Sequence, residues 1–287
     1  MSFNDNTNSK WLEELFHVKK PIIAMCHLQP LPGDPYYDEE GGMEKVIECA
    51  KHDVIALQNA GVDGIMFSNE FSLPYHINKV EPIVLAAMGF VIGQVKELVT
   101  VPFGVNCLWD PNSSLDLAKA TGAKFMREVI SGVYAADFGL WNTNSGETAR
   151  HRHRIGADDV RMLYNIVPDA SAYLSKRDVA SIAKTTEFNC RPDVLCVSGI
   201  TAGAAADFDV LTIVKNSVLK TPVFANTGCT KENIVKQLEV ADGACVATTL
   251  KVDGKFENPV DEKRATEFMN VVKEFRKTLE GVHCVIR

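Results

Sequence analysis

The chain has 287 residues, of which 46% are hydrophobic and 23% are charged, a balance typical of a folded globular protein. This composition excludes a disordered, collagen-like or low-complexity chain. Thirty Lys and Arg residues against 37 Asp and Glu give a net charge of −7, so the protein as a whole repels nucleic acid and anionic lipid, and an anionic ligand needs a local site.

The amino-terminal ten residues are polar and lack the apolar segment of a secretion signal, and no apolar run approaches the roughly 18 residues needed to span a bilayer. We therefore expect a cytoplasmic protein without an integral membrane segment. Eight cysteines are present, but most lie in apolar stretches and none forms a Cys-x-x-Cys pair. This pattern indicates buried free thiols rather than disulfides.

Eight short apolar runs recur along the chain, and the segments between them have apolar residues at helical spacing. The predicted strands are Ile22–His27, Gly64–Glu70, Phe103–Leu108, Phe125–Ile130, Arg161–Val167, Val194–Gly199, Val223–Thr227 and Ala244–Leu250. The predicted helices include Met43–Ala60, Val80–Val99, Ser114–Thr121, Asp178–Thr186, Asp207–Val218 and Lys231–Glu239. Several strands are apolar throughout, as parallel strands buried on both faces should be.

The ends of the predicted helices carry capping signals. Gly61 and Gly122 are expected in the left-handed conformation that ends a helix, and Ser113 or Ser114 is expected to cap the start of the third helix. The phrases around Gly61, Gly122 and Gly243 are alike, and each joins a helix to the next strand. One βα unit is therefore reused along the chain.

Eight units of about 29 residues predict an α/β protein with the (β/α)₈ TIM-barrel fold. The Gly-x-Gly-x-x-Gly turn of an open dinucleotide-binding sheet is absent after the first strand. We expect one barrel domain over residues 21–280, an amino-terminal extension over 1–20 and a carboxyl-terminal tail over 281–287.

The connection between the fourth and fifth predicted strands, Ser131–Ala157, is much longer than the others. A loop of this length is more often a lid or a site element than a simple connector. It ends in the basic run His151-Arg152-His153-Arg154, whose histidines diverge on a helix and do not form an i, i+4 zinc pair. We interpret the run as a solvated basic face, with a lid that contacts a substrate phosphate as the alternative.

Polar side chains gather at the carboxyl ends of the predicted strands, where barrels of this type bind their ligands. His27, Glu70 and Glu128 are candidate catalytic residues, with one carboxylate as the base and His27 as the acid. The candidate substrate-binding residues are Asn69, Asn106, Arg127, Asp137, Asn165 and Ser198. Each also has a structural interpretation, as a packing histidine, a turn former or part of an internal ion pair.

The same imidazole and carboxylates would suit a divalent cation, although the sequence requires no cofactor. A Schiff-base lysine has little support, because the strand ends offer only Lys251.

The loops after the last two predicted strands have the composition of a phosphate site. Gly228 allows the backbone to approach an anion closely, and the following helix adds its dipole. No acidic residue is expected in the cradle. The candidate phosphate-binding residues are Asn226, Thr227, Gly228, Thr248 and Thr249. The alternative is a capping turn made of the same small residues.

Several longer phrases carry a family resemblance. They are Met25-Cys-His27-Leu-Gln-Pro-Leu-Pro32-Gly33, Ser68-Asn69-Glu70, Phe125-Met-Arg127-Glu128, and Gly254-Lys-Phe-Glu-Asn258-Pro259-Val-Asp261. With them the chain resembles the BtpA family, most closely its SgcQ-like branch, from about Lys20 to Lys273. The resemblance implies a TIM barrel of the ribulose-phosphate-binding type.

The resemblance says less about the reaction. The family name reflects photosystem I biogenesis, whereas the SgcQ-like branch is associated with sugar-uptake and sugar-phosphate genes. This chain also departs from the family at the fifth strand, where Tyr164-Asn165-Ile-Val-Pro168-Asp169 stands in place of a phrase with a basic Lys-His pair.

We expect an enzyme that acts on a small phosphorylated sugar or a related phosphate ester by isomerase, epimerase or lyase chemistry. The alternatives are a non-catalytic assembly or biogenesis factor and a metal-dependent hydrolase of a phosphorylated compound. Barrels of this type often pair through their outer helices, so we also expect a homo-oligomer.

Overall fold

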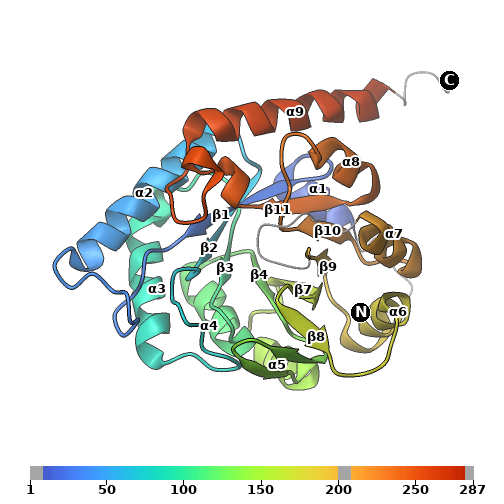
Figure 1. Cartoon of the computed structure of the whole chain (residues 1–287), viewed down its shortest axis with the longest axis horizontal. Helices are drawn as coiled ribbons and strands as arrows, with labels where there is room; N and C mark the ends of the chain where they lie inside the picture. Colours follow the sequence, from blue (N-terminus) through green and yellow to red (C-terminus); the bar gives the residue numbers. More distant parts are fainter. Residues whose placement is uncertain (1–8, 200–207, 282–287) are drawn as a thin grey trace.

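Eight parallel strands close into a barrel at the centre of the computed structural model, which describes residues 9–199 and 208–281 (Figure 1). The barrel strands are β1 (Ile22–His27), β2 (Gly64–Ser68), β3 (Phe103–Asn106), β4 (Phe125–Glu128), β7 (Arg161–Val167), β9 (Val194–Val197), β10 (Val223–Asn226) and β11 (Gly243–Val246). They neighbour one another in chain order, and β11 pairs with β1 to close the ring. The predicted single-domain (β/α)₈ barrel is confirmed.

Helices surround the barrel on its outer side (Figure 1). They are α2 (Gly42–Ala60), α3 (Pro82–Val95), α4 (Pro111–Thr121), α5 (Ser145–Arg154), α6 (Val179–Cys190), α7 (Phe208–Ser217), α8 (Ile234–Val240) and α9 (Glu262–Gly281). The long helix α9 packs against α2 and α8. The 3₁₀ turns are η1 (Lys96–Leu98), η2 (Thr248–Leu250) and η3 (Val252–Gly254).

The helix ends follow the capping rules, with one correction. Gly61 and Gly122 adopt the predicted left-handed conformation, with φ of 81° and 84°. The predicted cap of the third helix was wrong, because α4 starts at Pro111 and its cap is Asp110. The Asp110 carboxylate accepts hydrogen bonds from the backbone N–H groups of Asn112 and Ser113.

At the amino-terminal edge of the barrel, acidic residues that precede one strand bind the backbone of the strand beside it. Asp63 accepts a hydrogen bond from the backbone N–H of Ile22 at 2.7 Å, and Asp242 accepts one from Val223 at 2.8 Å. Asp193 accepts one in the same way from the preceding barrel strand, β7. Two copies of the repeated turn phrase, and Asp193 outside it, thus place a carboxylate where it ties the start of one strand to the start of its neighbour.

The amino-terminal end of the barrel is closed by α1 (Lys10–Phe16). Trp11 and Phe16 are buried in one cluster with Phe125, which points into the barrel from β4. Gly104 leaves room for the Phe125 ring because it has no side chain. A Cβ atom added at Gly104 would lie 2.1 Å from that ring. Part of the extension predicted for residues 1–20 therefore packs into the barrel end.

The long connection forms a small antiparallel sheet over the barrel rim instead of an irregular loop. Its hairpin strands β5 (Val133–Ala136) and β6 (Gly139–Asn142) pair with each other, and β5 also pairs with β8 (Ser171–Tyr173). Trp109 and Trp141 lie together in the aromatic cluster associated with this sheet.

The basic run at the end of α5 makes local contacts. The Nε2 atom of His151 lies 2.7 Å from the Asp116 carboxylate of α4, and Arg152 donates to the carbonyls of Ala157 and Asp158. His153 and Arg154 are exposed, as expected for a solvated face, whereas the side chains of His151 and Arg152 are mostly buried. The contacts do not place the run in a lid.

The seven cysteines within the described residues are free thiols, five of them buried, as predicted; Cys284 lies outside those residues. Over the same part of the chain, the helices are all too short or too polar to cross a membrane.

We predict opposite effects for alanine at two glycines. Gly104→Ala should destabilise the protein by about 1–3 kcal/mol or more, because the new methyl group overlaps Phe125 inside the barrel. At Gly93, on the exposed face of α3, an added methyl group would meet no other part of the described chain within 4 Å. Gly93→Ala should therefore stabilise the protein by up to about 1 kcal/mol. Urea denaturation measures both. Equal stability of the two variants would contradict the packing described for the barrel interior.

Candidate active site

A cavity of about 470 Å³ opens at the carboxyl ends of the barrel strands. One wall carries His27, Glu70 and Arg127, from the ends of β1, β2 and β4. A second wall consists of the loops after β10 and β11, with Thr227, Gly228, Cys229, Thr230, Thr248 and Thr249. The lining also includes Glu232, and beyond η2 it includes Asp253, Gly254, Phe256 and Arg264. The structure thus brings predicted catalytic and phosphate-binding residues to one cavity.

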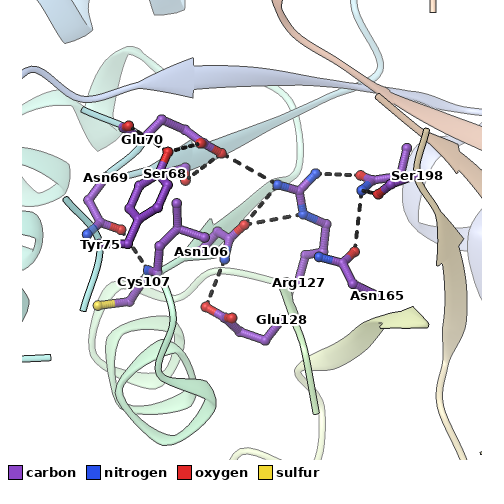
Figure 2. A network of polar contacts seen from close by, with 12 residues as sticks. Ser68, Asn69, Glu70, Tyr75, Asn106, Cys107, Arg127, Glu128, Asn165 and Ser198 are labelled. Carbon is purple, nitrogen blue, oxygen red and sulfur yellow. Dashed lines mark hydrogen bonds and ion pairs between the residues drawn. The ribbon is translucent and has the colours of Figure 1, made fainter. Parts of the chain in front are cut away.

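The guanidinium of Arg127 is the centre of a buried polar network across the barrel mouth (Figure 2). Its Nε and Nη2 atoms donate to Asn106 Oδ1 at 3.2 and 3.0 Å, and Nη1 donates to Asn226 Oδ1. Asn226 in turn donates to Ser198 Oγ at 2.8 Å and to Asn165 Oδ1 at 3.4 Å. Neutral amide oxygens therefore accept hydrogen bonds from most N–H groups of this desolvated guanidinium. The contacts hold it in one orientation at the cavity.

Glu70 faces Arg127 from the end of β2. Its Oε1 atom lies 3.7 Å from Arg127 Nη2 and accepts a hydrogen bond from Ser68 Oγ at 3.3 Å. Burial raises the pKa of the Glu70 carboxyl, and the positive charge of Arg127 opposes the rise. A carboxyl group with a raised pKa beside a cavity suits proton transfer near neutral pH.

His27 packs against two aromatic rings at the end of β1. Its ring centroid is 5.9 Å from that of Phe71 and 5.4 Å from that of Phe256. Burial lowers the pKa of His27 well below its usual range, and the charges of Lys251 and Arg127 lower it further. His27 is therefore neutral at neutral pH. Its buried Nδ1 atom has no hydrogen-bond partner among the described residues. The site therefore offers an imidazole and not the imidazolium acid expected from the sequence.

Glu128 does not line the cavity with the other two candidates. Residues of a strand alternate between the two faces of the sheet, so Arg127 points into the barrel and Glu128 points toward α4. Its Oε1 atom accepts hydrogen bonds from Asn106 Nδ2 at 2.8 Å and from Ser114 Oγ at 3.1 Å. Burial raises the pKa of Glu128 well above its usual range. The Glu128 carboxyl therefore holds the Asn106 side chain in place and does not face the cavity.

The loop after β10 has an unusual backbone conformation. Thr227 has φ of +105°, which is rare for a β-branched residue, and Gly228 has φ of +63°. Thr227 Oγ1 accepts a hydrogen bond from the N–H of Gly199 at 3.0 Å. Asn233 holds the other side of the loop through the carbonyl of Gly228 and the N–H of Thr230. These contacts fix a tight turn on the cavity wall.

Two expectations for this wall were wrong. The helix after the loop starts at Ile234 rather than Lys231, so its amino-terminal end lies further along the chain from Gly228 than predicted. Acidic residues are also present, because Glu232 and Asp253 line the cavity. The hydrogen bond from the Thr230 hydroxyl lowers the pKa of Glu232, which is therefore ionised at neutral pH.

Arg264 provides a positive charge at this wall that sequence reasoning missed. It lies in the first turn of α9, where the carboxylate of Asp261 accepts hydrogen bonds from the N–H groups of Lys263 and Arg264. Its Nε atom donates to the carbonyl of Thr249 at 3.2 Å, and its side chain lines the cavity. The signal in the sequence was the Asn258-Pro259-Val-Asp261 phrase, which begins the helix that carries the arginine.

The remaining candidates lie around the cavity rather than on its lining. Asn69 accepts a hydrogen bond from the N–H of Leu108 at 2.7 Å and so braces two strand ends. Asn106, Asn165, Ser198 and Asn226 belong to the network that holds Arg127, and they are buried. Asp137 is exposed in the turn of the β5–β6 hairpin.

Lys251 is buried beside the cavity wall. Its Nζ atom donates to the carbonyl of Phe256 and lies 4.7 and 5.2 Å from the ring centroids of Phe71 and Phe256. Burial lowers its pKa to about 8. The lysine is not part of the lining, so its position favours a role in holding the loop after β11.

The predicted cation ligands do not come together. His27 and Glu70 line the cavity, whereas Glu128 points toward α4. Within residues 9–199 and 208–281 there is no group of three His, Cys, Asp or Glu side chains arranged to hold a metal ion.

Comparison with known proteins identifies the family of the chain. The model of the BtpA family matches residues 18–274. The chain belongs to the BtpA family. It is 56% identical over 267 residues to the putative sgc region protein SgcQ of Escherichia coli K12, covering 93% of this chain and 99% of that protein. It is 32% identical over 277 residues to the photosystem I biogenesis protein BtpA of Synechocystis, covering 96% of each.

Solved structures agree with the barrel at low sequence identity. N-(5'-phosphoribosyl)anthranilate isomerase from Pyrococcus furiosus superposes with a TM-score of 0.52 at 14% identity, over 89% of this chain and 99% of that one. A structure described as native KDPGal gives 0.54 at 15% identity, over 90% and 96%. At this identity the likeness shows the fold alone.

We predict that Glu128→Gln stabilises this BtpA-family protein increasingly as the pH rises. The folded state holds the Glu128 proton more tightly than the unfolded state, whose pKa is near 4.5. Between these two pKa values, wild-type stability should fall by about 1.4 kcal/mol per pH unit relative to the variant. Thermal unfolding from pH 5 to 8 measures the difference. A difference that does not change with pH would contradict a neutral buried carboxyl.

Proposed function

We propose that the protein is an enzyme that acts on a small phosphorylated sugar or a related phosphate ester by acid–base isomerase, epimerase or lyase chemistry. The observation that carries the proposal is the cavity itself. It combines the Thr- and Gly-containing loops after β10 and β11 with Glu70, His27 and Arg127 in one lining. Its volume of about 470 Å³ is in the range of small-ligand sites.

The phosphate group would bind at the wall made by the two loops. Gly228 lets backbone atoms approach an oxyanion closely, and the hydroxyls of Thr227, Thr248 and Thr249 supply donors. The Arg264 guanidinium supplies the positive charge that an overall acidic protein must provide locally. It also balances the carboxylates that share the wall.

The reacting carbon would lie toward Glu70. A carboxyl with a raised pKa exchanges a proton with a substrate carbon or hydroxyl more readily near neutral pH than an ordinary glutamate. Arg127 lies 3.7 Å from the carboxyl and would stabilise negative charge on the substrate oxygen. Neutral His27 would donate a hydrogen bond to the same oxygen, and Glu128 would act indirectly, through Asn106 and Arg127.

Names of similar proteins are consistent with this substrate class. The solved Pyrococcus furiosus enzyme is an isomerase of a phosphoribosyl compound. The homo-oligomer expected from the fold type stays a prediction.

We predict that inorganic phosphate stabilises the wild-type protein through Arg264. Phosphate at about ten times its Kd should stabilise the folded state by about 1.4 kcal/mol, or about 2–4 °C in Tm. Arg264→Gln should lose most of this shift. Arg150→Gln is the matched control, because Arg150 is exposed on α5 and donates to the carbonyl of Gly146.

Differential scanning fluorimetry with phosphate, sulfate and a panel of sugar phosphates makes the measurement. The proposal fails if phosphate and all sugar phosphates leave Tm unchanged. An equal shift in wild type and the R264Q variant would place the anion elsewhere.

A non-catalytic biogenesis role is the second candidate, because the Synechocystis relative with that name aligns over 96% of this chain. Two results would favour this role over an enzymatic one. A pull-down would recover a stoichiometric protein partner, and a Glu70→Gln variant would keep full function in cells.

A further inference from the structure

Tyr75 connects the candidate catalytic carboxyl to the small sheet over the barrel rim. Its hydroxyl lies 3.2 Å from Glu70 Oε2 and 3.0 Å from the Glu70 carbonyl oxygen (Figure 2). The other carboxyl oxygen, Oε1, faces Ser68 and Arg127. The Glu70 side chain is therefore held from two sides, with one oxygen on the arginine and the other on the tyrosine.

The tyrosine ring is packed by Phe138 of the hairpin and by Trp109, which lies between β3 and α4. Phe138 lies in the turn between β5 and β6, and its ring meets that of Tyr75 edge-on with centroids 5.8 Å apart. Trp109 meets the same ring at 6.0 Å. Both Phe138 and Trp109 pack in turn on Trp141 of β6, at 5.0 and 5.1 Å. The position of the Tyr75 hydroxyl thus depends on the docking of the hairpin.

The hydroxyl acts on Glu70 as a hydrogen-bond donor. Burial and the nearby Glu70 charge raise the pKa of Tyr75 far above neutrality, so the hydroxyl keeps its proton. The charged groups that face Glu70 are Arg127 on β4, Asp169 on the β7–β8 connection and Lys251 after β11. Asp169 raises the pKa of the carboxyl, whereas Arg127, Ser68 and Tyr75 lower it.

We propose that Tyr75 is a positioning residue that holds the Glu70 carboxylate against Arg127, and that the β5–β6 hairpin controls this hold by packing Phe138 on the tyrosine ring. The long connection is then part of the catalytic apparatus without contacting the substrate. It sets the orientation and the proton affinity of the group that exchanges the proton. The inference rests on the proposed function in one respect, namely that Glu70 is the group that exchanges the proton with the substrate.

The test follows the protonation of Glu70 directly. Carbon-detected NMR of the full chain labelled with ¹³C at Glu carboxyl groups gives the titration midpoint, and Glu70→Gln assigns the resonance. Tyr75→Phe removes one hydrogen bond to a charged group and should raise the midpoint by roughly one to two pH units. Phe138→Ala keeps the hydroxyl and should raise the midpoint by a smaller amount.

Tyr134→Phe is the matched control. Tyr134 lies in the same aromatic cluster and donates to the carbonyl of Ile166 at 3.0 Å, so the variant loses a buried hydroxyl without touching Glu70. Its midpoint should equal that of the wild type.

An unchanged midpoint in folded Y75F protein would overturn the role of Tyr75. If Y75F does not fold, an unchanged midpoint in the F138A variant overturns the role of the hairpin, and with it the proposal. Phosphate binding is measured separately at Arg264, so a failure of the proposed function is distinguishable from a failure here.

Discussion

The buried positive charge of Arg127 is the constraint on which the rest of the site depends. A guanidinium taken out of water must have its N–H groups satisfied, or the barrel mouth would lose several kcal/mol of stability. Asn106 and Asn226 meet this need with amide oxygens, and their own N–H groups then require acceptors. Glu128, Ser198 and Asn165 supply those acceptors. One charge thus fixes polar side chains on several strands.

The barrel separates this polar layer from an apolar one. The same strand, β4, contributes Phe125 to the closed amino-terminal end and Arg127 to the open carboxyl end. Apolar side chains fill the amino-terminal half of the barrel interior, and glycines make room for the rings among them. Helix α1 covers this end. Polar side chains can accumulate only at the mouth, where the loops after β10 and β11 and the first turn of α9 leave a cavity.

Periodicity and turn chemistry predicted most of the fold from sequence. The eight strands were found because β-branched runs and glycine turns repeat at one spacing, and strand ends on one side of a barrel converge by topology. Arg264 was missed because the phrase Asn258-Pro259-Val-Asp261 indicates where α9 starts but not that its first turn packs on η2. Glu128 was assigned to the cavity because it follows Arg127 near the end of a predicted strand. Side chains alternate along a strand, so Phe125 and Arg127 point into the barrel and Glu128 points outward.

The central claim is that the wall formed by the loops after β10 and β11 binds a phosphate group facing Arg127 and Glu70. A crystal structure of the protein grown or soaked in phosphate tests this most directly. The account predicts tetrahedral density beside Gly228, within hydrogen-bond distance of Arg264 and a threonine hydroxyl. Density for phosphate only on the outer helices, with the cavity holding water alone, would contradict it.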